Sequence, residues 1–319
     1  MSERQPPPTP AFWLLVALST TLLSLGFYVS WSYVLAWLDS LWQVCQGGLT
    51  RFALNPLLSW QVVVPLTIGL AVGGAVLSLA RQMSATSRLA RIFWPLQQTP
   101  PEWLLALLRP HALTRTDIVF LNLTSPHAFC LGFWRPRLWL TAGLLDLLTD
   151  DELGAVLAHE AHHLRQRDPL RLLISRALKS AFFFIPLIAD LARLAELEQE
   201  VVADRQAIAH CGDDLPLLSA LQKLLRRGRK QAGLEPALSG PAVCTPFNLT
   251  EARLRRLLYP PSAVNWTSRL LRLGLSLSIV GLLSSTIYLS CPGPLASQGQ
   301  IDTCFEAAFP PHSSTLRLN

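Results

Sequence analysis

Residues 149–168 have the sequence Thr149-Asp-Asp-Glu-Leu-Gly-Ala-Val-Leu-Ala-His-Glu-Ala-His-His-Leu-Arg-Gln-Arg-Asp168, which contains the pattern His-Glu-x-x-His. Thr149 followed three residues later by Glu152 predicts a capping box, and therefore the start of a helix. Larger side chains then recur at helical spacing at Leu153, Val156, Leu157, Glu160 and Leu164. Pro169 disfavours continuation of the helix past Asp168. The stretch therefore predicts one helix that carries the whole motif.

The motif predicts a zinc site. On a helix His159 and His163 lie one turn apart, so both imidazoles can bind the same zinc ion, and Glu160 beside them can take a proton from a metal-bound water. Chance can place His-Glu-x-x-His on an ordinary helix, but the apolar flank 155–158 predicts burial, which would cost roughly several kcal/mol for unpaired polar groups. A bound metal removes that cost. His162 is expected to face solvent or to form a core hydrogen bond rather than to bind the metal.

Composition predicts a membrane protein. Hydrophobic residues make up 50% of the 319 residues and charged residues only 15%, whereas soluble domains average about 25% charged. The net charge is +6, but only three of the 27 Lys and Arg residues lie outside residues 81–272, namely Arg4, Arg51 and Arg317. This asymmetry is typical of a cytoplasmic central region with translocated flanks, and it argues against nucleic-acid binding.

Charge and hydropathy divide the chain into five segments. Residues 1–10 are expected to be a disordered N-terminus, and residues 11–80 to form two transmembrane helices joined by a short external loop. Residues 81–272 are expected to form a cytoplasmic catalytic domain, and residues 273–290, which are uncharged, a third transmembrane helix. Residues 291–319 would then be a short external tail. The sequence therefore predicts a multi-pass protein of the cell membrane.

The cysteines fit this division. The external tail contains Cys291 and Cys304, and in an oxidising compartment we expect them to form a disulfide worth roughly 3 kcal/mol. Two free thiols are the alternative. Cys130, Cys211 and Cys244 lie in the central region and are expected to be reduced.

The central region contains a short helical pattern at 103–108 and a strand pattern at 117–123. Within 125–141, two β-rich pieces flank a turn at 134–137 and predict a hairpin immediately before the motif helix. An edge strand of this hairpin could pair with the backbone of a substrate, or the hairpin could simply cover the helix.

The region after the motif predicts further helices. Residues 169–189 are apolar but are interrupted by the cations Arg171, Arg176 and Lys179. These cations favour a membrane-associated amphipathic helix, with a third spanning segment as the alternative. A carboxylate-rich helix is expected at 196–208 and an amphipathic helix at 215–227.

Residues 60–290 resemble the integral-membrane zinc metallopeptidases, which comprise the HtpX and CAAX prenyl-protease family and the peptidase domain of β-lactam sensor-transducers (BlaR/MecR-like). The resemblance is carried by Phe129-Cys-Leu-Gly-Phe-Trp-Arg-Pro136, Glu152 to His163 with Arg167-Asp168, Phe182-Phe-Phe-Ile-Pro-Leu187, and Glu200-Val-Val-Ala-Asp204. It implies a mainly helical, gluzincin-like peptidase domain with a small β-hairpin or sheet, and one Zn²⁺ per chain.

The resemblance also implies roles for single residues. His159 and His163 would be zinc ligands, Glu160 the general base, Glu200 the third ligand, and Asp204 a partner that orients a ligand. The chain departs from the family at His127, where the HtpX branch has an asparagine. Only a short tail follows Ser290, so direct β-lactam sensing is not expected.

The helix face supports Glu200 over its neighbours. Glu196, Glu198 and Glu200 are spaced two residues apart, so that neighbours point about 200° away from one another on a helix. Glu200 shares its face with Ala203, which permits a close approach, and with Asp204, which can orient an imidazole. Neither of the other two glutamates has this pairing.

The sequence therefore predicts a membrane-embedded zinc endopeptidase that hydrolyses peptide bonds in membrane proteins or cytoplasmic regulators. Its expected partners are the lipid bilayer and a protein substrate, with no nucleic acid, and the oligomeric state is left open. A signalling or antirepressor scaffold that uses a peptidase-like domain for partner binding is the alternative. A transporter is disfavoured, because the first two apolar runs contain no charged residue.

Overall fold

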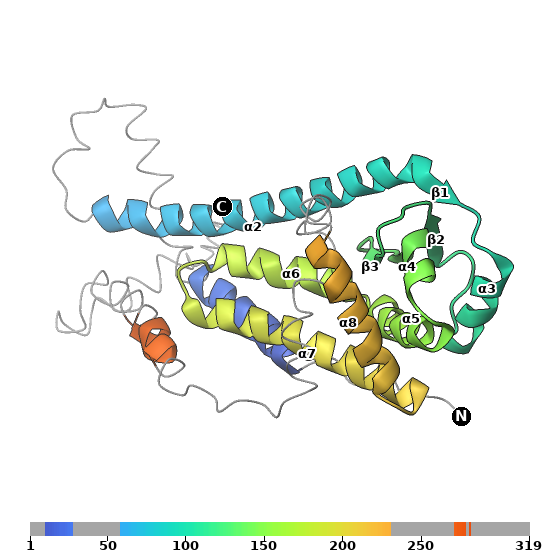
Figure 1. The fold of residues 1–319 in the computed structure, drawn as a ribbon. Coiled ribbons are helices and arrows are strands. Elements are labelled where there is room, and N and C mark those ends of the chain that lie inside the picture. The colour runs from blue at the N-terminus through green and yellow to red at the C-terminus, as the bar shows by residue number, and fades with distance from the viewer. Residues whose placement is uncertain (1–9, 28–57, 231–270, 279–280, 282–319) are drawn as a thin grey trace, which may run out of the picture. The chain divides into compact units, whose positions relative to one another are not determined.

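The structure is a computed structural model that describes residues 10–27, 58–230, 271–278 and 281 (Figure 1). The predicted N-terminal disorder, the predicted external loop and tail, Cys244 and the predicted Cys291–Cys304 disulfide lie outside these residues. The chain divides into two compact units, one made of Met1–Gly26 with Thr67–Leu273 and the other of Phe27–Leu66 with Gly274–Asn319. The second unit is described only as helical pieces, so the fold below is that of the first.

Two helices are long and apolar enough to cross a membrane, at Pro10–Phe27 and Leu66–Leu96. The second overlaps most of α2 (Leu58–Phe93), which does not end at Arg81, where the apolar run ends in the sequence. Its apolar part exposes Leu66, Leu70, Val72, Val76 and Leu77. Such a surface is suited to contact with lipid rather than with water.

A four-stranded sheet follows α2, in the order β1-β2-β4-β3. Its strands are β1 (Gln97–Gln98), β2 (Ile118–Leu121), β3 (Ala128–Leu131) and β4 (Arg137–Thr141). The predicted hairpin is confirmed by the antiparallel pairing of β3 with β4, in which Phe129 lies opposite Trp139. The sheet is larger than a hairpin, because β2 pairs with β4 in parallel and β1 with β2 antiparallel.

The two faces of the sheet pack against different helices, because successive side chains of a strand point to opposite faces. One face packs on the end of α2, with Phe129 and Trp139 against Phe93. The other face packs on the motif helix, where Cys130 and Leu138 join a core that includes Leu157. The sheet therefore lies over the motif helix, with both of its faces buried.

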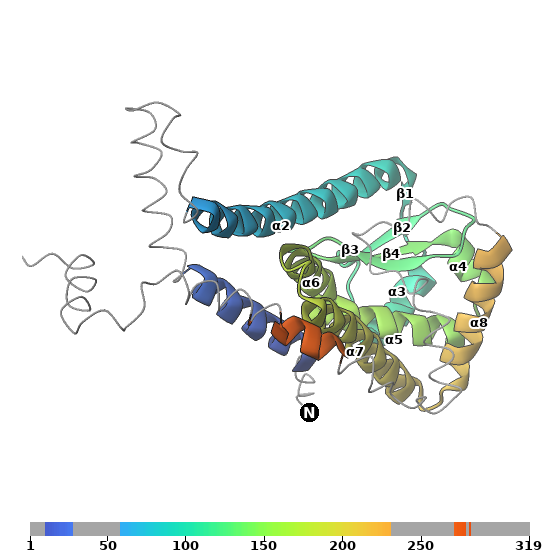
Figure 2. The same cartoon turned by 90° about the vertical axis from the view of Figure 1, so that its left-hand side faces the viewer.

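The remaining helices form most of the domain (Figures 1 and 2). They are α3 (Glu102–Leu108), α4 (Ala142–Leu147), α5 (Asp150–Gln166), α6 (Asp168–Ala181), α7 (Pro186–Cys211) and α8 (Leu215–Lys230). The predicted helices at 103–108, 196–208 and 215–227 are present within α3, α7 and α8, and α5 is the predicted motif helix.

The single helix predicted over residues 169–189 is wrong. The chain instead forms α6, a turn over residues 182–185, and the beginning of α7. Pro186 explains the break, since its ring disfavours helical backbone at the preceding residue and it lacks an N–H. Proline is favoured in the first turn of a helix, and α7 begins at Pro186.

Candidate metal centre

The motif helix α5 is fixed at both ends. At its start the Thr149 hydroxyl accepts the backbone N–H of Glu152, and the Glu152 carboxylate accepts that of Thr149, which is the predicted capping box. The same carboxylate also accepts hydrogen bonds from the Ser219 hydroxyl and the Lys223 ammonium of α8. At its end Arg167 adopts a left-handed conformation with φ 53°, and its N–H caps the helix by donating to His163 and Leu164 carbonyls.

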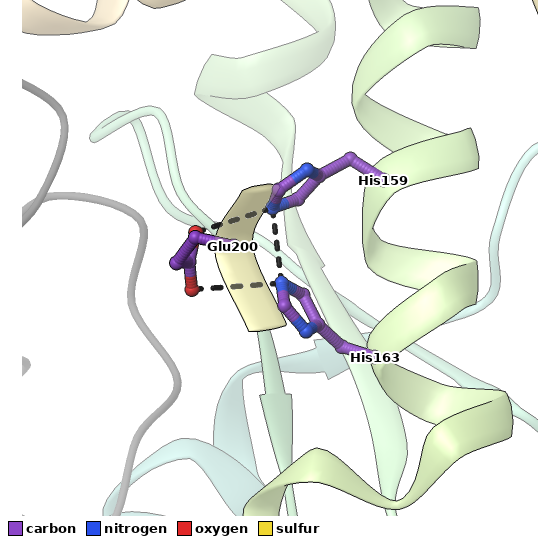
Figure 3. Close-up of side chains that lie close together, drawn as sticks. All are labelled: His159, His163 and Glu200. Carbon is purple, nitrogen blue, oxygen red and sulfur yellow. Dashed lines mark hydrogen bonds and ion pairs between the residues drawn. The ribbon is translucent and has the colours of Figure 1, made fainter. Parts of the chain in front are cut away.

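Three side chains predicted to bind zinc lie together (Figure 3). The Nε2 atoms of His159 and His163 are 3.0 Å apart. Glu200 of α7 places one carboxylate oxygen 3.6 Å from His159 Nε2 and the other 3.7 Å from His163 Nε2. The two histidines are 3% exposed and Glu200 is 12% exposed. The three groups therefore converge on one buried point.

The close approach of α5 to α7 depends on alanines. Ala155 and Ala158 of α5 pack with Ala207 of α7, and Ala203 of α7 is fully buried. A helix pair can come this close only where small side chains meet. The full burial of Ala203 is consistent with the prediction that it lies on the side of α7 that permits a close approach.

Both histidines are oriented by carboxylates on their other ring nitrogen. Asp204 Oδ1 lies 3.1 Å from Nδ1 of His159, in the position predicted for it. Asp168 Oδ2 lies 2.7 Å from Nδ1 of His163, a contact that the sequence analysis did not predict. When each Nδ1–H donates to its carboxylate, each Nε2 keeps a lone pair directed at the shared point.

This donor set fits zinc. Two imidazoles and one glutamate are the protein ligands of one class of catalytic zinc sites, which keep a fourth position for water or substrate. Zn–N bonds of about 2.0–2.1 Å at a tetrahedral angle would put the two nitrogens roughly 3.3 Å apart, close to the separation seen here. The three donor atoms all lie within 4.8 Å of one another.

The charge of the site favours a cation. Burial alone would lower the pKa of His163, but its hydrogen bond to Asp168 and the negative charges of Glu200, Asp168 and Glu160 raise that pKa to about 9. The carboxylates therefore stabilise positive charge at this point, whether it is a proton or a metal ion.

The two other glutamates of α7 point elsewhere. Glu196 lies 3.7 Å from the guanidinium of Arg176 on α6. Glu198 accepts the backbone N–H of Ala11, at the start of the helix Pro10–Phe27. Of the three glutamates that compete in the sequence, Glu200 is the one that the structure brings to the histidines.

Glu160 is 1% exposed and contacts the sheet. The Sγ of Cys130, on β3, lies 3.5 Å from Glu160 Oε2 and 3.5 Å from its backbone carbonyl oxygen. The sequence analysis did not predict this contact. The only feature of the sequence that could have indicated this contact is the alternation of side chains along the strand, which places Cys130 on the face of β3 that meets α5. Cys130 and Cys211 form no disulfide with one another.

The two remaining histidines near the motif are in the core. His162 is 4% exposed, so it does not face solvent, and burial with the neighbouring His163 lowers its pKa to about 4. His127 is also buried, which lowers its pKa to about 4. Its backbone N–H donates to the Thr141 hydroxyl and holds the two strands of the hairpin together. Both side chains are therefore neutral at neutral pH.

Comparison with known proteins agrees with the resemblance predicted from the sequence. Residues 61–214 match the family described as BlaR1 peptidase M56. A stretch of 90 residues is 37% identical to a protein of Aeropyrum pernix described as a protease HtpX homolog, and it covers 26% of this chain and 28% of that relative. The chain thus matches less than a third of the relative's length. These matches support an HtpX- and BlaR1-like metallopeptidase domain built around α5.

Proposed function

We propose that this chain is a multi-pass membrane endopeptidase that depends on one zinc ion, held by His159, His163 and Glu200. The observation that carries the proposal is the pair of Nε2 atoms 3.0 Å apart, each on a ring whose Nδ1 faces a carboxylate. If these histidines had only a structural role, there would be no need for the Nε2 lone pairs of both rings and the carboxylate of Glu200 to point at one buried position. The similarity of residues 61–214 to a metallopeptidase family supports the same assignment.

Zinc, when bound, would lower the pKa of a water ligand toward about 7 and polarise the scissile carbonyl. Glu160 would take the proton of the attacking water and deliver it to the leaving amine. Glu160 is enclosed by protein, and the thiol of Cys130 lies against its carboxylate. Asp168 and Asp204 would hold the two imidazoles in their ligating tautomer throughout the reaction.

The sheet offers a place for an extended substrate. β3 is the outer strand in the order β1-β2-β4-β3, and Cys130 on β3 touches Glu160. A peptide that paired with the outer edge of β3 would therefore run near the carboxylate of Glu160. Of the two roles that the sequence left open for the hairpin, substrate pairing and cover for the helix, this position supports both.

We propose that residues 81–272 face the cytoplasm, since they contain 24 of the 27 Lys and Arg residues. The substrates would then be membrane proteins, or cytoplasmic regulators that reach the inner face of the membrane. The two helices long and apolar enough to span a bilayer support a membrane location.

The test compares new peptide N-termini in membranes from cells that carry the wild type, Glu160→Gln or the control Glu196→Gln. Glu160→Gln should keep its zinc and lose cleavage, by on the order of 10²–10⁴-fold for loss of a general base. Glu196→Gln should cleave as the wild type does, because Glu196 faces Arg176. Unchanged cleavage by Glu160→Gln would rule out the peptidase mechanism, and a cellular phenotype that Glu160→Gln fully preserves would favour the signalling scaffold.

A further inference from the structure

The turn between α6 and α7 lies in a stretch without charge. Residues 180–189 have the sequence Ser-Ala-Phe-Phe-Phe-Ile-Pro-Leu-Ile-Ala and are bounded by Lys179 and Asp190. Phe183, at the turn, is 67% exposed. A large apolar side chain at the end of a helical hairpin would be unfavourable in water. The surroundings of this turn decide what covers it.

α6 runs antiparallel to the apolar part of α2. The Ser78 hydroxyl contacts the backbone carbonyl of Arg176 at 3.5 Å. Four residues further back along α2, a Cβ added at Gly74 would lie 2.9 Å from the backbone carbonyl oxygen of Ser180. Gly74 and Ser78 belong to the helix Leu66–Leu96, which is apolar enough to span a membrane. As α6 proceeds toward its end, it therefore runs back along the apolar part of α2 (Figure 1).

The depth of this contact follows from helix geometry. Gly74 lies seven residues before Arg81, the first cation after the apolar run, and seven residues rise about 10 Å along a helix. Because Ser180 lies beside Gly74, the end of α6 is about 10 Å beyond the level of Arg81. That distance is inside the hydrocarbon region if Arg81 lies at the interface.

Two contacts involve charged side chains on the two arms of the hairpin. Phe12, at the start of the helix Pro10–Phe27, packs under the guanidinium of Arg171, whose Cζ is 5.9 Å from the ring centroid. Arg272 pairs with Asp190, and Arg272 immediately precedes the uncharged run 273–290. Each arm of the hairpin thus carries a charged side chain in contact with another part of the chain, Arg171 on α6 and Asp190 on α7.

Three backbone N–H groups at the turn are bonded within the protein, which lowers the cost of placing this segment in a medium without water. Phe182 N–H donates to the Leu178 carbonyl, Ile185 N–H to that of Phe182, and Ile188 N–H to that of Ile185. Pro186 has no N–H to satisfy. Hydrocarbon tolerates only backbone whose polar groups are bonded within the protein. The long stem of Lys179, which is exposed, allows its ammonium to reach the headgroups.

We propose that residues 180–189 form a re-entrant tip that inserts into the acyl chains of one leaflet of the bilayer. This is the leaflet on the side where α2 leaves the membrane and its basic part, from Arg81 onward, begins. This proposal rests on the membrane placement in the proposed function but not on peptidase activity. It assigns Phe183 to lipid contact, and it makes α6 and α7 two arms of a hairpin that enters and leaves the bilayer on one side.

The test uses the full chain in phosphatidylcholine and phosphatidylglycerol vesicles, with a genetically encoded, environment-sensitive fluorescent amino acid at position 183. Matched probes replace Leu70, which is exposed on the apolar part of α2, and Arg205, which is exposed near the far end of α7. Emission is measured with nitroxide on the lipid acyl chains and, separately, with iodide in the water.

We expect the probes at 183 and 70 to lose roughly half of their emission to the acyl-chain nitroxide, as probes within a hydrocarbon core about 30 Å thick should, and to resist iodide. The probe at 205 should respond to iodide alone. Iodide quenching at 183 with lipid quenching at 70 would overturn the tip while leaving the membrane placement intact. Iodide quenching at both would overturn the placement and the tip together. Resistance of position 183 to both quenchers would also overturn it, because the side chain would then be covered by protein.

Discussion

Asp168 holds Nδ1 of His163 at 2.7 Å because the helix that carries the histidine ends between them. Asp168 is five residues after His163, and on a continuous helix a side chain at that spacing would point away from it. The left-handed Arg167 turns the chain, so that Asp168 begins α6 with its carboxylate directed back at the imidazole. The break between α5 and α6 is therefore part of the candidate metal centre.

Asp168→Asn is expected to weaken zinc binding by about 10–100-fold, which is typical for loss of a carboxylate behind a ligand histidine. The amide keeps the size of the side chain but cannot supply its charge to His163. Competition with a zinc chelator of known affinity measures the change. Asp168 also accepts a hydrogen bond from the guanidinium of Arg171. Arg171→Gln is therefore the matched control and should bind zinc as the wild type does. Equal weakening in both variants would attribute the effect to the Asp168–Arg171 pair instead.

Glu200→Ala is expected to lower the zinc content of the purified protein severely, since it removes one of three ligands. Glu196→Ala and Glu198→Ala should leave zinc content near that of the wild type, because Glu196 faces Arg176 and Glu198 faces the N–H of Ala11. Metal analysis of the three variants by mass spectrometry is the measurement. Full zinc in Glu200→Ala with loss in Glu198→Ala would move the third ligand to Glu198.

Two glycines should respond in opposite ways to alanine. At Gly143 an added Cβ would lie 2.0 Å from the backbone oxygen of Thr124, so Gly143→Ala forces two backbone segments apart and should cost about 1–3 kcal/mol or more. At Gly154, on α5, nothing lies within 4 Å of an added Cβ, so Gly154→Ala should stabilise the helix by about 0.5–1 kcal/mol. Thermal unfolding in detergent reports both. A stable Gly143→Ala protein would show that the connection into α4 can move.

Stability is expected to fall between about pH 6.5 and pH 4, partly because of His111. Burial, with the charges of His210 and Arg165, lowers the pKa of His111 to about 4, whereas an unfolded histidine has a pKa near 6.5. The folded protein therefore binds fewer protons in this window, and acid favours unfolding. Above about pH 6.5 both states are neutral at this position and the effect vanishes.

The check is the pH dependence of unfolding for His111→Gln and for the control His210→Gln. His210 is exposed and lies with its ring centroid 4.3 Å from that of His111. His111→Gln should flatten the fall in stability between pH 6.5 and 4, whereas His210→Gln, which leaves His111 buried, should flatten it only slightly. An unchanged slope in His111→Gln would assign the acid sensitivity to other groups, such as the buried His127 and His162.

The parts of the fold that could be predicted are those set by neighbours in the sequence. Thr149 and Glu152 determine the start of α5 through a local capping box, and alternation with turn residues marks the β3–β4 hairpin. Glu200 could be chosen over two neighbours because helix geometry fixes which residues share its face. In each of these cases the signal lies within a few residues of the feature.

The parts that could not be predicted depend on contacts distant in sequence or on one unusual dihedral angle. β1 consists of two glutamines that acquire strand structure only by pairing with β2. The role of Asp168 depends on the positive φ of Arg167, a residue type that does not mark such a conformation. The contact of Cys130 with Glu160 joins residues 30 positions apart, and only the packing of sheet on helix creates it.

If α7 stands along the membrane normal, its length sets the height of Glu200 above the proposed membrane-inserted tip. Glu200 follows Pro186 by fourteen residues on one unbroken helix, a rise of about 21 Å. If the tip at the start of α7 reaches about 10 Å into the hydrocarbon, the metal ligand stands about 10 Å outside it, within the headgroup layer or just above. α7 would then hold the candidate metal centre at a fixed distance from the bilayer, within reach of peptide bonds that lie a few residues outside the lipid.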